Sequence, residues 1–222
     1  FGALFVLTVA FLFSMNAKAQ TQGPLPLLSW RANTFVPSAY GGRALPTANS
    51  EGEVWLALVD GGRTVDLASY PVRWFVNDKF AKGGVGMTNF SIRTADIPGR
   101  TTLSVRAEVL NYGSQTLTKG ASIPVVSPEV TLVAPYLGSR IGGSFSIEAL
   151  PYFFNVKDIS SLLVSWRVNG VEPGNYADPF LLFIKIPSGT VPGSRIAVNA
   201  TLKNPSSLFE SASAEKNFEY RP

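Results

Sequence analysis

The chain has 222 residues, 45% hydrophobic and 15% charged, a balance that favours a folded globular protein over a disordered one. It contains no cysteine and no histidine, which excludes disulfides, thiolate nucleophiles, histidine-based metal sites and a Ser-His-Asp triad. The net charge of +4 has no basic run behind it, which argues against nucleic-acid binding.

The N-terminal segment carries a targeting signal. Residues 1–13 are almost wholly apolar, and Ala17 and Ala19 then occupy the small positions of a cleavage site. This arrangement is typical of a secretory signal peptide, so we predict that residues 1–19 are removed after Ala19 and that the protein is exported to the cell envelope, cell surface or extracellular space. Two alternatives keep the segment: a membrane-anchor helix, or a pilin-type helix packed into a filament. Most such pilins carry Glu at the fifth position, where this chain has Phe5.

The next part of the chain is a series of short apolar segments separated by turn residues. In residues 72–78, Val72, Trp74 and Val76 occupy alternate positions and so lie on one side of an extended chain, and a period of two predicts a strand with one buried face. A glycine-rich loop is expected around Gly83, Gly84 and Gly86. The predicted strands are residues 28–33, 53–59, 72–78, 88–94, 102–110 and 121–126.

After the short junction at residues 127–129, the same plan repeats. Trp74 precedes Val105 by 31 positions, and Trp166 precedes Val198 by 32. The spacing predicts a duplicated architecture in which each tryptophan lies in its own core: domain 1 at residues 20–127 and domain 2 at residues 128–222. The predicted strands of the second domain are residues 129–134, 144–149, 163–169, 181–186, 195–203 and 214–220.

Short strands with turn signals about every 8–12 residues favour an all-β fold of two tandem sandwiches. With a tryptophan in the third strand of each unit, followed by Val-Asn-Asp at 76–78 and Val-Asn-Gly at 168–170, the chain resembles the immunoglobulin-like superfamily, in the cysteine-free form of bacterial cell-surface proteins and related PKD-type modules. The resemblance implies a fold and no particular activity. The family's inter-sheet disulfide is absent, so packing around each tryptophan must hold the core.

Two loop regions are candidate contact sites. The loop from Asp60 to Pro71 and the loop at residues 111–114 should share the free tip of the first domain, which makes Arg63, Tyr70 and Tyr112 candidate partner contacts. In the second domain, residues 151–154 form an aromatic loop that is either an exposed partner patch or a seal between the domains. Because the linker is so short, we favour interdomain packing by Tyr152, Phe153 and Phe154.

The sequence predicts no catalytic, metal or cofactor site. Asp60, Asp66 and Asp78 are too sparse for calcium, and no two carboxylates are placed as a glycoside hydrolase requires. We therefore expect a non-catalytic exported surface protein whose modules serve as spacer, adhesion or assembly unit, with an unknown protein or glycan as partner. The alternatives are a pilin-like filament subunit, which implies homo-assembly, and a glycan-binding accessory module of an enzyme. Membrane contact would involve only residues 1–19, if they are uncleaved.

Overall fold

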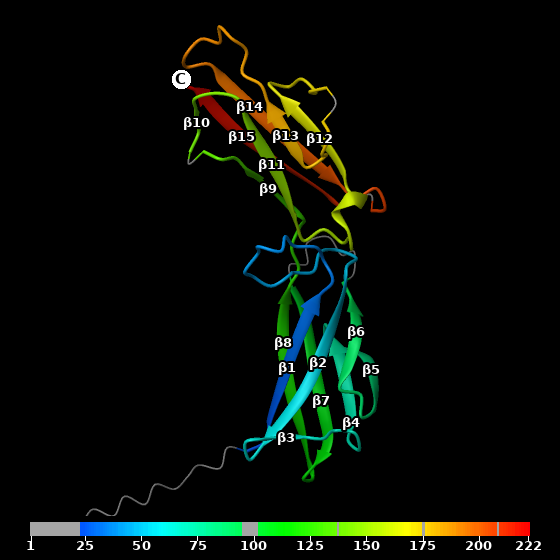
Figure 1. Ribbon diagram of the computed structural model, residues 1–222. Helices are drawn as coiled ribbons and strands as arrows, with labels where there is room; N and C mark the ends of the chain where they lie inside the picture. Colours follow the sequence, from blue (N-terminus) through cyan, green and yellow to red (C-terminus); the bar gives the residue numbers. More distant parts are fainter. Residues whose placement is uncertain (1–22, 95–101, 137, 175, 208) are drawn as a thin grey trace, which may run out of the picture.

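A computed structural model describes residues 23–94, 102–136, 138–174, 176–207 and 209–222. The predicted N-terminal helix and its cleavage positions, Ala17 and Ala19, lie outside these residues. The described chain forms two β-sandwiches joined end to end (Figure 1). No helix in this described part has the length and apolarity that a membrane crossing requires.

The first sandwich consists of two sheets. In one, β1 (Leu25–Ala32) pairs with β2 (Glu51–Asp60), whose other edge pairs with β3 (Arg63–Val65) and β6 (Asn89–Arg93). In the other, the order is β5-β4-β7-β8. Its strands are β4 (Pro71–Val76), β5 (Lys79–Val85), β7 (Thr102–Tyr112) and β8 (Gln115–Pro124).

The second sandwich repeats the plan. One sheet has the order β13-β11-β9 and the other β10-β15-β14-β12, where β10 runs parallel to β15. A single 3-10 turn, η1 (Ile159–Ser161), precedes β12 in the described chain. The strands are β9 (Glu129–Val133), β10 (Arg140–Ile141), β11 (Phe145–Tyr152), β12 (Leu163–Val168), β13 (Leu181–Ile184), β14 (Arg195–Lys203) and β15 (Ser211–Tyr220).

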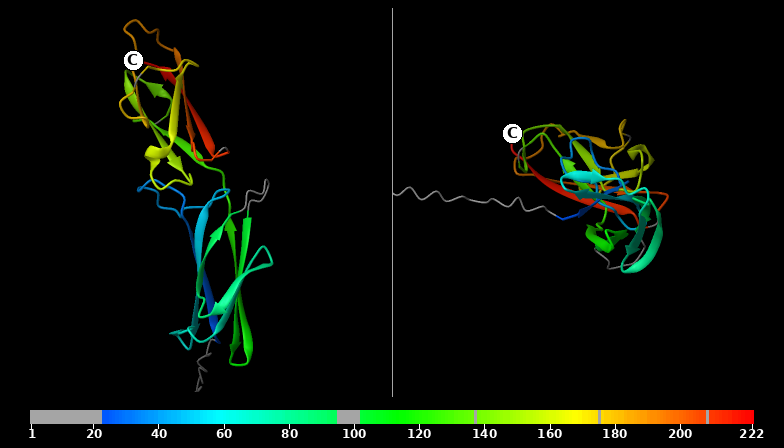
Figure 2. Two further views of the ribbon diagram at one scale, coloured as in Figure 1. Left: turned by 90° about the vertical axis from the view of Figure 1, so that its right-hand side faces the viewer. Right: turned by 90° about the horizontal axis from the view of Figure 1, so that it is seen from below.

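The strand pairing identifies the fold. In each unit the tryptophan strand, β4 or β12, pairs with β7 or β14, which pairs with the last strand, while the first two long strands pair in the opposite sheet. This is the arrangement of immunoglobulin-like sandwiches. The prediction of an all-β chain with two tandem immunoglobulin-like sandwiches is therefore confirmed. Figure 2 shows the two units following one another along the long axis.

Each sandwich has its own apolar core. One cluster of buried side chains is drawn from β2, β4, β6, β7 and neighbouring residues, and the other from β9 to β15. Trp74 lies in the first cluster and Trp166 in the second, and both are 0% exposed. Because the clusters share no residue, each half of the chain buries apolar surface independently.

In the glycine-rich stretch predicted as a loop, Gly83 and Gly84 lie instead in strand β5, and only Gly86 follows the strand. Asn77 and Asp78 both adopt positive φ angles, 49° and 62°, and form a two-residue turn between Val76 and Lys79. Such a turn matches the twist of a hairpin and directs the chain back along β4. A second tight turn after Tyr112 has the same effect, so β8 starts at Gln115, earlier than predicted.

The aromatic segment of the second unit was predicted as a loop, but its first half belongs to strand β11. Pro151 lies opposite Val130 and Tyr152 opposite Glu129 in strand β9. Beyond Glu148 the other edge of β11 no longer pairs with β13, so the missing N–H of Pro151 removes no ladder bond there. Only Phe153 and Phe154 follow the strand.

Candidate functional site

The two tryptophans that dominate the sequence have structural surroundings. The Trp74 indole N–H donates to the carbonyl of Met87 at 2.8 Å, and that of Trp166 donates to the carbonyl of Pro179 at 2.9 Å. Each acceptor lies thirteen residues after its tryptophan. Because both rings are buried and their only donor is satisfied, neither is available to a ligand.

The asparagine after each tryptophan strand is also used by the fold. Two hydrogen bonds join Asn77 to Ser104. The Asn77 N–H donates to the Ser104 carbonyl at 2.8 Å, and the Ser104 N–H donates to Asn77 Oδ1 at 3.2 Å. Asn169 and Ala197 make the same pair in the second unit, both at 2.8 Å. The repeated Val-Asn motif therefore closes a turn onto the neighbouring strand.

The tip of the first sandwich brings together residues far apart in sequence. The Tyr112 hydroxyl donates to Asp60 Oδ2 at 2.7 Å, and the rings of Tyr70 and Tyr112 lie 5.3 Å apart. The hydrogen bond to Asp60, with smaller contributions from desolvation and from the negative charge of Asp60, raises the pKa of Tyr112 above its usual 10.0. The phenol is therefore a neutral donor at physiological pH.

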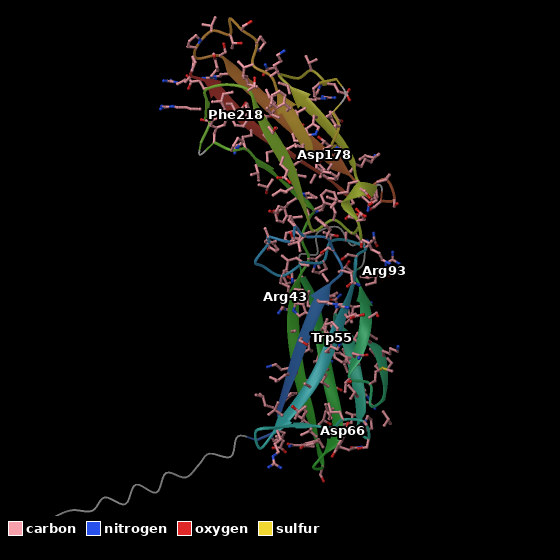
Figure 3. All side chains as sticks on the ribbon, in the orientation of Figure 1. Arg43, Trp55, Asp66, Arg93, Asp178 and Phe218 are labelled. Atoms are coloured by element: carbon pink, nitrogen blue, oxygen red, sulfur yellow. The ribbon has the colours of Figure 1, made fainter. Side chains whose placement is uncertain are left out.

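Arg63 lies at the same tip but outside this cluster. It is the first residue of β3, opposite Asp60 across the Gly61-Gly62 turn, whose φ angles are 55° and 77°. Its side chain is exposed and makes no ion pair with any described residue. Of the three predicted contacts, the structure thus joins Tyr70 to Tyr112 and leaves Arg63 beside them. Asp66, labelled in Figure 3, marks the same end of the sandwich.

Aromatic residues lie where the two sandwiches meet. The ring of Tyr40, from the long connection between β1 and β2, lies 5.5 Å from the ring of Tyr152 and 5.9 Å from that of Phe153, both edge-on. Phe153 and Phe154 are buried. Phe35 pairs with Phe154 as an isolated antiparallel β-bridge: the Phe35 N–H donates to the Phe154 carbonyl and the Phe153 N–H donates to the Phe35 carbonyl, both at 2.7 Å.

A buried carboxylate supports this junction from the second unit. Glu210 is 6% exposed and accepts hydrogen bonds from the Asn155 N–H and, at 2.7 Å, from Asn204 Nδ2. The Asn155 side chain then reaches the Asn49 carbonyl of the first unit at 3.4 Å. Glu210 therefore holds the loop between β14 and β15 against the residues that follow β11.

Carboxylates of the exposed loops cap backbone turns. Asp66 accepts from the Ala68 N–H at 2.9 Å, Asp158 from the Ser160 N–H at 2.9 Å and Asp178 from the Phe180 N–H at 2.8 Å. The Ser160 hydrogen bonds hold the pKa of Asp158 below its ordinary value. Within the described ranges, no three Asp or Glu side chains are grouped as a metal ion requires.

One surface residue was missed by the sequence analysis. Residues 53–59 were treated as an almost continuous apolar run, but Val54, Leu56 and Leu58 are buried, and Trp55 points to the opposite face. Trp55 is labelled in Figure 3, on β2 in the middle of the first sandwich. The alternation of the strand was the signal that places it outside the core.

No protein-family model matches the sequence, and no curated protein matches it. Similar solved structures include the fibronectin(III)-like modules of Clostridium thermocellum CbhA (11% identity, 84% of this chain and 92% of that chain, TM-score 0.29). A second is the three N-terminal domains of the bacteriophage RB49 outer capsid protein Hoc (9% identity, 89% of this chain and 59% of that chain, TM-score 0.47). A third is the ectodomain of mouse nectin-like molecule 4 (14% identity, 88% of this chain and 63% of that chain, TM-score 0.37). The chain thus spans about three fifths of the length of the Hoc and nectin-like structures.

With identities and scores this low, the assignment depends on the strand pairing described above. That pairing defines the class: the chain is a tandem immunoglobulin-like β-sandwich protein.

Proposed function

We propose that the chain is an exported, non-catalytic surface protein whose two sandwiches act as one stiff spacer. The observation that carries this proposal is the bridge between Phe35 and Phe154. It gives the two sandwiches a second attachment besides the linker at residues 127–129. A third is the bond from Asn155 Nδ2 to the Asn49 carbonyl, at 3.4 Å, which holds the residues after β11 to the connection between β1 and β2. Several separate attachments oppose both bending and rotation about a single peptide hinge.

The backbone of Phe153 supports the same conclusion. Its φ angle is 62°, a left-handed conformation that costs a bulky residue about 1–2 kcal/mol. Its N–H bond to Phe35 and the contact of its buried ring with Tyr40 offset that cost. The junction is therefore built to one geometry, which is the property a spacer needs.

A stiff spacer holds what lies at its ends at a set distance. The tip cluster of Asp60, Tyr70 and Tyr112, with Arg63 beside it, is formed where β2 and β7 end and β3 begins. These strand ends lie at the end of the first sandwich away from the junction (Figure 1). We propose this tip as the contact surface for a protein or glycan at the cell surface. The assignment to the bacterial, PKD-like branch of the superfamily is part of the same proposal.

Small-angle X-ray scattering of the full chain tests the spacer. We expect one elongated particle whose distance distribution stays unchanged with temperature below unfolding. Tyr40→Ala should broaden that distribution because it removes the ring that packs on Tyr152 and Phe153. Phe80→Ala, which truncates an exposed aromatic of β5, is the matched control and should change nothing. A broad distribution for the unmodified chain contradicts the spacer.

Cell fractionation with mass spectrometry of the mature N-terminus tests export. The proposal expects a surface or extracellular protein that begins at Gln20. Recovery in high-mass assemblies that retain residues 1–19 would favour a filament subunit instead. Recovery in the cytoplasm with those residues present contradicts export altogether.

A further inference from the structure

The outer face of the first sheet carries a tryptophan that the fold does not use as core. Trp55 lies on β2 between Val54 and Leu56, which point into the sandwich. An indole gains most from burial, so its place on a solvent-facing sheet surface calls for a reason.

Trp55 is half-buried, and its neighbours leave part of it accessible. Its cross-strand partners are Ser29 on β1 and Asn89 on β6, both exposed and both small. Arg31 approaches the indole from β1, and its guanidinium carbon lies 5.5 Å from the ring centroid. Arg31 is in turn held by Glu53 at 3.0 Å, so a cation, a carboxylate and an aromatic ring form one ordered group.

A hollow of about 260 Å³ lies beside this group. Such a volume falls below the roughly 300–1,000 Å³ of sites for drug-sized ligands, and so suits one ring of a larger molecule. Except for two aromatic rings, its wall is hydrogen-bonding side chains. The lining residues are Glu53, Trp55, Lys82, Asn89, Phe90 and Ser91.

We propose that this hollow binds a pyranose ring of an oligosaccharide. The C–H face of a sugar ring is apolar and packs on an indole, while its hydroxyls need donors and acceptors around the rim. Glu53 supplies an acceptor, Lys82 a donor and Asn89 both. An apolar side chain would leave these groups unpaired, and the two cations, Arg31 and Lys82, are too few for a nucleic-acid backbone.

A glycan array probed with the full chain tests the inference, followed by titration of the best-bound oligosaccharide. Trp55→Ala is expected to weaken binding by about tenfold or more, as truncation of a central aromatic contact does. Asn89→Ala should weaken binding severalfold while circular dichroism shows an intact fold. If Trp55→Ala does not fold, the affinity of Asn89→Ala alone tests the site. The matched control is Phe183→Ala, which removes an aromatic ring that is 63% exposed on β13 of the other sandwich.

Unchanged affinity in Phe183→Ala, together with the losses at Trp55 and Asn89, supports the site. The inference is overturned if no oligosaccharide on the array binds, or if both Trp55→Ala and Asn89→Ala bind as tightly as the unmodified chain. The spacer proposal depends on the junction alone and survives either result.

Discussion

Replacing Trp166 by alanine should destabilise the second sandwich and leave the stability of the first unchanged. Trp166 is fully buried and its indole N–H is bonded to Pro179, so truncation leaves both a cavity and an unpaired carbonyl. Loss of a buried tryptophan costs about 3–5 kcal/mol. A unit of about 95 residues has a free energy of unfolding of about 5–14 kcal/mol, so the variant loses a large part of it.

The distribution of tryptophans makes this loss easy to measure. The chain has four tryptophans, and three of them, Trp30, Trp55 and Trp74, lie in the first sandwich. In Trp166→Ala, urea unfolding followed by tryptophan fluorescence therefore reports the first sandwich alone, whereas far-ultraviolet circular dichroism reports both. With a urea m-value of about 1–3 kcal/mol/M, the expected loss shifts the midpoint of the second unit by about 1–5 M.

We expect the dichroism curve to split and the fluorescence midpoint to stay in place. Trp166→Phe is the control: it keeps an aromatic ring in the core and should shift the second transition less. In the reciprocal variant, Trp74→Ala, the urea midpoint reported by the fluorescence of Trp30 and Trp55 should fall. If the fluorescence midpoint of Trp166→Ala falls as far as the dichroism midpoint, the two cores unfold as one and the reasoning is refuted.

Two further changes test local geometry. Asn169→Ala should lower the free energy of unfolding of the second sandwich by about 2–3 kcal/mol, since alanine loses the bond from the Ala197 N–H and must hold a φ angle of 50°. Asn169→Gly keeps that angle and should cost about 1 kcal/mol in the same urea assay, and equal losses would contradict the explanation. Because the pKa of Tyr112 is raised, its bond to Asp60 stabilises the folded state at neutral pH, and this stabilisation is lost as the pH rises above 10 and through the folded-state pKa. Asp60→Ala should lower that pKa toward 10.0, as seen in ultraviolet titration of tyrosinate; Tyr112→Phe identifies the transition, and an unmoved curve argues against the bond.

The strands were predictable where a local pattern determines them. Val72, Trp74 and Val76 face inward because side chains of a strand alternate, whatever the strand pairs with. Strand β5 was missed because its residues are mostly exposed, so it has no buried face to read. It is a strand because the turn at Asn77 and Asp78 returns the chain to the edge of β4.

The candidate sites were predictable only in part. Loops that share one end of an immunoglobulin-like sandwich follow from the topology, which is why Tyr70 and Tyr112 could be grouped before their contact was seen. The part played by Tyr40 could not be predicted. It comes from the connection between β1 and β2, and nothing near it in sequence indicates that it packs on Tyr152 and Phe153.

The sequence by itself determined the fold class, the duplication and the inward side of each tryptophan strand. The strands and their inward sides depend on residues a few positions apart, and the duplication depends on a spacing along the chain that recurs in both halves. Only the tertiary structure decided which distant side chains meet. Asp60 and Tyr112 are 52 residues apart, and Ser29, Trp55 and Asn89 lie on three different strands. Such neighbours are set by the register between strands, and a shift of one residue would turn Trp55 into the core and leave the outer face without its indole.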